Sequence, residues 1–287
     1  MSASRAAPVP ARDVRTRRIR FAYPDGALNR LYVDNDLVMS HIVSMLSATF
    51  PEGEAFFVRS VRHYADRVND PELKRQVAGF IGQEVTHGRE HRELNDRLQQ
   101  MGYPTRFVDR FVKAGLKRQE RLYGPAWSLA VTAALEHYTA TLAEKLLTSE
   151  RAQALLGGNE VRSLLLWHAL EESEHKSVAF DVFRTTVGNE RMRIRAMRVT
   201  TFLFLLEMTA HTLHSLALDR ATYHPIRLLR SVAALRRSPF LERDVVARLR
   251  EYNVVGFHPD DNDNCALVTR WTAELFGADG TLADHLH

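Results

Sequence analysis

The sequence contains a single cysteine, Cys265, which excludes an internal disulfide framework and is compatible with a reducing cytoplasm. Proline and glycine are modest in number and no low-complexity tract occurs, so the chain is expected to be globular. The formal net charge is only +4 and no basic patch is interleaved with aromatic residues, which argues against nucleic-acid binding. No charged-then-apolar signal pattern begins the chain, and we predict a cytoplasmic protein.

Positive charge is concentrated at the start of the chain, where residues 1–20 carry several arginines against the single acid Asp13. We predict a basic, disordered tail here, with a targeting or anionic-surface role as the alternative. No later linker is rich enough in proline and glycine to separate two domains. Residues 21–287 are therefore predicted to form a single helical domain, with a core at about 35–188 and flanking helices at about 190–287.

Apolar residues recur with a helical period in most of the chain, and no strand–helix alternation is evident, so the predicted fold class is all-α. Asp70 and Pro71 supply an N-cap and a proline at the first helical position. The predicted helices cover residues 35–46, 51–68, 71–102, from 125 through the following apolar stretch, from 160 to 188, 190–218, 225–236, 239–252 and 265–276.

The stretch HALEESEH, residues 168–175, directly follows an apolar run and is rich in side chains that bind metals. At about 100° per residue, His168, Glu172 and His175 fall within roughly 60° of one another, on the stripe that the helix buries. Glu171 and Glu174 point about 100° or more away from Glu172, and we predict that both face solvent.

Glu172 and His175 form a Glu-x-x-His pair, which places a carboxylate and an imidazole one turn apart. The chain has one other such pair, Glu84 and His87, on a helix whose stripe is also apolar. Either pair alone would be weak evidence for a metal site. The two together, on separate helices, indicate a shared centre.

Two isolated glutamates, Glu54 and Glu136, lie on further apolar stripes. A buried carboxylate without a partner costs several kcal/mol, so four of them on successive helices need compensation, which two divalent cations would supply. Ferritin-like dimetal proteins use this order of ligands, with one Glu on each of two helices and Glu-x-x-His on each of two others. The predicted ligands are Glu54, Glu84, His87, Glu136, His168, Glu172 and His175.

We predict a ferritin-like four-helix bundle with a dimetal-carboxylate core and additional flanking helices. The expected cofactor is two iron ions, with Mn or Zn as the alternatives for this thiolate-free ligand set. His91, one turn beyond His87, is expected to support a ligand by a hydrogen bond, with direct ligation as the alternative. No catalytic residue beyond these ligands and no residue for an organic cofactor can be assigned.

The sequence resembles the family of predicted metal-dependent hydrolases from FPEGEAFFVRSVRHYADRVNDPELKRQVAGFIGQEVTHGREH through HALEESEH to the GFHPDDND loop. This resemblance implies a ferritin-like helical bundle and metal-dependent hydrolysis. The spacing of the ligands is also similar to that of p-aminobenzoate N-oxygenases, a group of di-iron enzymes. Their pattern implies a further histidine ligand four residues before the last Glu-x-x-His, which is His168 here.

Three classes of function remain open, and an O2-activating di-iron oxidase or oxygenase for a small apolar or aromatic substrate is the first hypothesis. Its partners would be the substrate, O2 and an external electron donor. The alternative is a hydrolase that uses a dinuclear metal-activated water. A non-catalytic metal-binding protein is the third class.

The apolar segment 199–218 carries Glu207, His211 and His214 on one face and follows a basic cluster. A buried helix that flanks the bundle is the first interpretation. A membrane-surface helix and a transmembrane span are the alternatives. A peripheral membrane contact and a homodimer are therefore left open.

Overall fold

The computed structural model describes residues 13–287, and in this range the regular structure is helical, without a β-strand. An isolated antiparallel bridge joins Ile19 to Leu286. The predicted all-α class is confirmed. The α-helices are α1 (Leu37–Arg62), α2 (Pro71–Gln100), α3 (Thr105–Thr148), α4 (Glu150–Leu155), α5 (Glu160–His175), α6 (Val178–Thr186), α7 (Glu190–Leu218), α8 (Pro225–Leu235), α9 (Arg243–Glu251) and α10 (Cys265–Phe276), and the 3-10 helices are Ala65–Arg67, Arg220–Tyr223, Pro239–Leu241, Pro259–Asp261 and Ala283–His285.

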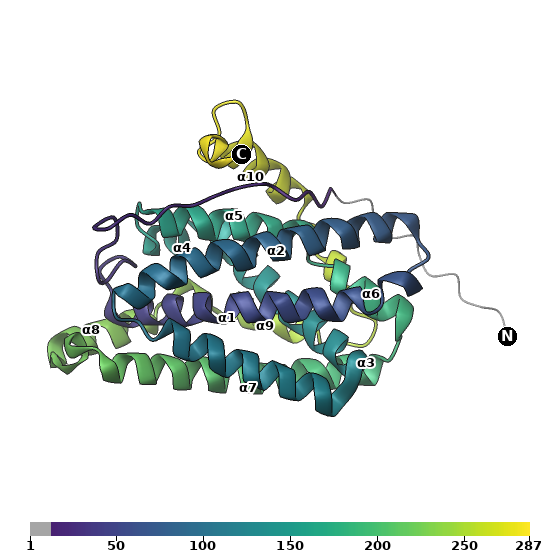
Figure 1. Ribbon diagram of the computed structural model, residues 1–287, viewed down its shortest axis with the longest axis horizontal. Coiled ribbons are helices and arrows are strands. Elements are labelled where there is room, and N and C mark those ends of the chain that lie inside the picture. Colours follow the sequence, from purple (N-terminus) through teal and green to yellow (C-terminus); the bar gives the residue numbers. More distant parts are fainter. Residues whose placement is uncertain (1–12) are drawn as a thin grey trace.

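The longest helices, α1, α2, α3 and α7, run along the long axis of the molecule (Figure 1). α1 packs against α2 and α3, and α5 packs against both α2 and α3. α7 lies against α1 and α3, whereas α10 lies outside α5 (Figure 1). Four helices, α1, α2, α3 and α5, therefore surround a shared interior.

This interior is apolar at both ends and polar in the middle. One apolar cluster contains Leu94 of α2 and Leu164 of α5, and the other contains Phe80 of α2 and Val178 of α6. The residues between them in α2 and α5 include the two Glu-x-x-His pairs. Burial of the apolar clusters on either side holds the polar layer away from water.

The start of α2 follows directly from its sequence. The side chain of Asp70 accepts a hydrogen bond of 2.8 Å from the backbone N–H of Leu73, and Pro71 occupies the first helical turn. Gly102, with φ of 93°, turns the chain after the helix ends. The predicted limits of α7 and α10 also agree with the structure.

Several predicted helix limits were wrong. Residues 35–46 and 51–68 do not form two helices, because α1 continues through Pro51 to Arg62. The charged segment before Pro125 is helical too, and Gly124, with φ of 75°, kinks α3 at that point. The predicted helix from 160 to 188 is divided into α5 and α6 after His175.

The predicted disordered tail, residues 1–20, falls partly outside the described residues, which begin at residue 13. The described part lies extended along the protein, and the side chain of Ile19 is fully buried. The backbone N–H of Arg20 donates to the carbonyl of His285 at 3.1 Å, and that of His287 donates to Arg18 at 2.9 Å. This segment is therefore packed between the bundle and the end of the chain.

α7 was predicted to be a buried flanking helix, and this is wrong for one of its faces. Ala196 and Met197 are buried against the bundle, whereas Phe202, Leu205 and Leu206 are more than half exposed. Among residues 13–287, no helix combines the length and apolarity required to cross a membrane. The alternative of a transmembrane span in α7 is thereby excluded.

Candidate metal centre

The four helices around the interior bring every predicted ligand into one cluster. α1 supplies one carboxylate, α2 supplies one Glu-x-x-His pair, α3 supplies one carboxylate, and α5 supplies the other pair with one more histidine. All of these residues are 3% exposed or less. They are Glu54 of α1, Glu84 and His87 of α2, Glu136 of α3, and His168, Glu172 and His175 of α5, with His91 of α2 beside them.

His175 joins three of the carboxylates. Its Nε2 lies 3.1 Å from Glu84 Oε1, 3.3 Å from Glu136 Oε2 and 3.6 Å from Glu172 Oε2. His87 Nδ1 lies farther from two of these carboxylates, at 3.9 Å from Glu84 Oε1 and 3.8 Å from Glu172 Oε1. Donor atoms from three helices thus converge on one small volume.

A second set of donors lies beside the first. His168 Nε2 is 2.9 Å from Glu172 Oε1 and 3.8 Å from Glu54 Oε1. His91 Nε2 lies 2.8 Å from His168 Nδ1, within hydrogen-bond distance. Whether His91 supports a ligand in this way or binds a cation directly stays a prediction.

Two groups of three donors that share no residue meet the distance requirement for holding a cation. Ligand atoms within each group lie within 4.8 Å of one another. Glu172 and His87 also take part in other groups of this kind, which link the two. The two separate groups are Glu84, Glu172 and His175, and Glu54, His91 and His168.

The hydrogen-bonding capacity of these residues is largely unused within the protein. Both carboxylate oxygens of Glu54, Glu84 and Glu136 are buried without a hydrogen-bond partner. The same holds for His87 Nδ1 and His175 Nε2, whose contacts with carboxylates lack hydrogen-bond geometry. Buried polar atoms are rarely left unpaired, so a positively charged group fits this centre.

Burial strongly perturbs the ionisation of the centre. Desolvation and the neighbouring carboxylates raise the pKa of Glu54 and Glu84 well above the usual range, and they raise the pKa of Glu136 to about 7. Burial also opposes the charges of Glu172 and His175, but their mutual attraction prevails. This attraction lowers the pKa of Glu172 and raises the pKa of His175.

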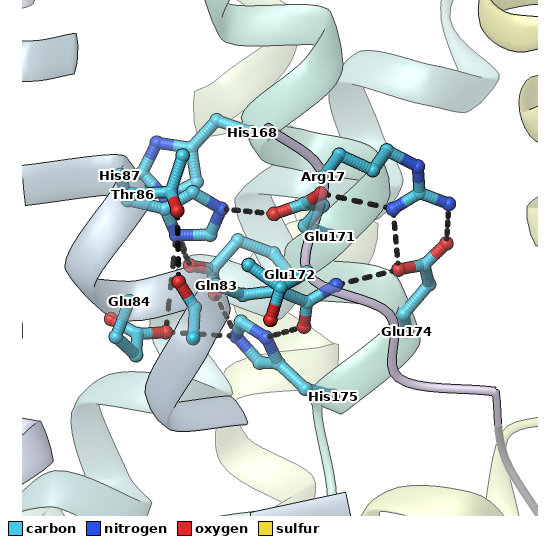
Figure 2. Close-up of polar contacts among 12 residues, drawn as sticks. Arg17, Gln83, Glu84, Thr86, His87, His168, Glu171, Glu172, Glu174 and His175 are labelled. Carbon is cyan, nitrogen blue, oxygen red and sulfur yellow. Dashed lines mark hydrogen bonds and ion pairs between the residues drawn. The ribbon is translucent and has the colours of Figure 1, made fainter. Parts of the chain in front are cut away.

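The ring nitrogens of His87 and His175 that face away from the cluster are held by hydrogen bonds (Figure 2). His87 Nε2 donates to Glu171 Oε2 at 3.1 Å, and His175 Nδ1 donates to Gln83 Oε1 at 2.8 Å. The amide of Gln83 in turn donates to Glu174 Oε2 at 2.7 Å. With these nitrogens held on the outer side, His87 Nδ1 and His175 Nε2 face the carboxylates and are the ring atoms that would hold a cation.

Glu171 and Glu174 were predicted to face solvent, and the structure shows that this is wrong. Both are buried beside Arg17, whose guanidinium donates to Glu171 at 2.9 Å and to Glu174 at 2.6 and 2.9 Å (Figure 2). Burial opposes the charge of Arg17, but its bonds to Glu174 and Glu171 raise its pKa overall. Helical periodicity could not reveal this because the partner lies more than 150 residues away in the chain.

The buried centre of carboxylates and imidazoles makes this helical protein a candidate metal-binding protein. The comparisons with known proteins identify the family. Residues 15–263 match the family described as predicted metal-dependent hydrolase, and the chain belongs to this family. No curated protein and no solved structure matches the chain.

The family assignment overturns the first hypothesis, an O2-activating di-iron oxidase or oxygenase. It supports the alternative, a metal-dependent hydrolase. The similarity to p-aminobenzoate N-oxygenases gains no support from the comparisons. That prediction was wrong because dimetal ligand spacing constrains the metal site more closely than it constrains the reaction carried out there.

Proposed function

We propose that the protein is a hydrolase whose catalytic centre holds two divalent cations. The observation that carries this proposal is the set of buried carboxylate oxygens without hydrogen-bond partners on Glu54, Glu84 and Glu136. With Glu172, four carboxylates supply a charge of −4, which two divalent cations balance. Each of the two separate groups of three ligand residues offers a place for one cation.

The arrangement supports a ferritin-like bundle as the structural framework. One Glu comes from each of α1 and α3, and one Glu-x-x-His pair comes from each of α2 and α5. This is the distribution of ligands in dimetal-carboxylate bundles. Carboxylate and imidazole donors suit Fe, Mn or Zn, and metal analysis would distinguish them.

Such ions, when bound, lower the pKa of a water molecule and polarise a carbonyl or phosphoryl oxygen. The protein contributes rigid positioning and exclusion of bulk water. His87 and His175 are fixed by Glu171 and Gln83. Because the surrounding side chains are almost fully buried, the electrostatic interactions of the centre are weakly screened.

Glu84→Gln tests the assignment with nearly unchanged side-chain volume. We expect this variant to lose bound metal and hydrolytic activity, since an amide cannot supply the negative charge. The matched control is Glu93→Gln, because Glu93 lies exposed on the same helix. Metal content is measured by elemental analysis of protein purified without chelator, and activity is measured with a panel of chromogenic esters and phosphoesters.

The metal-loaded wild type and Glu93→Gln should bind equal amounts of metal and hydrolyse the same substrate, whereas Glu84→Gln should do neither. Full metal content in Glu84→Gln would contradict the ligand assignment. Hydrolysis that survives complete removal of metal from the wild type would contradict the proposed reaction.

A further inference from the structure

A cavity of about 610 Å³ extends from the metal centre between α1, α3 and α7. Glu54, His168 and Glu172 belong both to its lining and to the centre. The volume falls within the range of about 300–1,000 Å³ typical of small-molecule sites. The cavity is therefore large enough for an organic substrate that reaches the centre.

The cavity connects the interior with the surface. Glu54 and Glu172 are at most 3% exposed, whereas Leu122 and Tyr123, which line it as well, are 62% and 64% exposed. A ligand that enters beside α3 could thus place one end at the centre and leave the rest of its length along the cavity.

The chemistry of the lining favours a flexible apolar ligand. Most of the wall consists of aliphatic and aromatic side chains, among them Leu46, Phe57, Leu116, Leu135, Leu142 and Phe204. Within the described part of the chain, the lining contains one arginine or lysine, Arg118, and it is exposed. A ligand with a negative charge far from the centre would lose its hydration without gaining a buried partner.

We propose that this cavity binds the hydrocarbon chain of an aliphatic acyl ester, with the ester carbonyl at Glu54, His168 and Glu172. This inference rests on the proposed hydrolase function. Water adds its oxygen to the acyl carbon, the bond from that carbon to the alcohol oxygen breaks, and a proton from water passes to the leaving alcohol. The products are a fatty acid and an alcohol, and no oxidant is needed.

Substitution of two glycines in the cavity wall tests how long a chain the cavity can hold. Gly53 of α1 and Gly115 of α3 both line it, and a Cβ atom at either position would meet no atom within 4 Å. Larger side chains there would occupy cavity space. Because leucine also favours helix more than glycine does, these substitutions should not impair folding.

The experiment measures binding of neutral primary alcohols of increasing chain length to the metal-loaded protein by calorimetry. Affinity should rise about fourfold for each added methylene until the chain fills the cavity. Gly53→Leu and Gly115→Leu should move this plateau to shorter chains. The control is Gly158→Leu, because Gly158, like Gly115, is exposed and has open space for a Cβ but lies outside the cavity lining.

A plateau that shifts in the two cavity variants and stays in place in the control would support the assignment. Affinity independent of chain length, or tighter binding of naphthalene than of alcohols of similar size, would overturn it. Hydrolysis of p-nitrophenyl esters of the same chain lengths is measured separately. Chain-length-dependent binding without any ester hydrolysis would contradict the proposed function and leave the binding site assigned.

Discussion

Arg17 links the extended N-terminal segment to the metal centre. Its side chain is 13% exposed, and its guanidinium pairs with the buried Glu171 and Glu174. Glu171 accepts from His87, and Glu174 accepts from Gln83, which holds His175. The charge of a single residue therefore supports the orientation of both Glu-x-x-His histidines.

Arg17→Ala should destabilise the protein by about 3–5 kcal/mol, because removal of one partner leaves buried carboxylates uncompensated. The free energy of unfolding can be measured by urea denaturation. The matched control is Arg15→Ala, since Arg15 pairs with Asp13 at the surface and such pairs contribute at most about 1 kcal/mol. Equal effects of the two substitutions would contradict the role assigned to Arg17.

Glu136 should make the stability of the metal-free protein depend on pH. Burial and the charge of Glu172 raise its pKa from the usual 4.5 to about 7. Its protonation therefore stabilises the folded state fully below about pH 4.5, and this contribution is lost as the pH rises through about 7. Over this range the loss amounts to about 3 kcal/mol.

Glu136→Gln isolates this contribution, because the amide does not titrate. The free energy of unfolding of the metal-free wild type, relative to that of the variant, should fall as pH rises from about 4.5 to about 7. Urea denaturation of both proteins at a series of pH values gives this difference. A difference that does not change with pH would show that the pKa of Glu136 is not raised in the folded protein.

α1 and α2 approach closely at the centre, and Gly88 permits this approach. A Cβ atom at Gly88 would lie 3.1 Å from Glu54 Oε2 and 3.7 Å from the Cα of Pro51. Any side chain there would crowd the carboxylate that α1 contributes. The absence of a side chain on α2 thus fixes the position of a predicted ligand on α1.

Gly88→Val should displace the Glu54 carboxylate and lower metal affinity on the order of 10–100-fold, as loss of a supporting contact does in other metal sites. Titration of the metal-free protein with a divalent cation measures this change. Val85→Ala serves as a control on the exposed face of α2, where Val85 is 57% exposed. Unchanged affinity in Gly88→Val would contradict the close packing of Glu54.

Elements with strong local signals could be predicted from the sequence. Asp70 and Pro71 identified the start of α2, and the Glu-x-x-His pairs identified side chains that the structure brings together. Pro51 was interpreted as a helix start, but α1 passes through it, because packing of the buried residues on both sides outweighs the lost hydrogen bond. The prediction that Glu171 faces solvent was wrong because its partner, Arg17, is distant in sequence.

The centre brings together helices that are far apart in the chain. α1, α2, α3 and α5 each supply at least one carboxylate, so cations bound at this centre would together connect helices from distant parts of the chain. Their carboxylates repel one another when ionised, and bound cations would relieve this repulsion. Metal binding and global stability are therefore expected to be coupled.

Removal of metal should lower the stability of the entire protein. A cation present at 100 times its dissociation constant contributes about 2.7 kcal/mol to the folded state. The melting temperature should consequently rise with the concentration of free metal and fall after treatment with chelator. A melting temperature that is independent of metal, in protein shown to bind it, would mean that the cation does not join the four helices.

The source of the oxygen atom in the product tests the central claim, metal-dependent hydrolysis, most directly. Metal-loaded protein is incubated without O2 in isotopically labelled water with an acyl ester that it converts, and the product acid is analysed by mass spectrometry. Hydrolysis predicts that label from water enters the acid at a rate that requires metal. Product formation that requires O2, with oxygen derived from O2, would contradict the account.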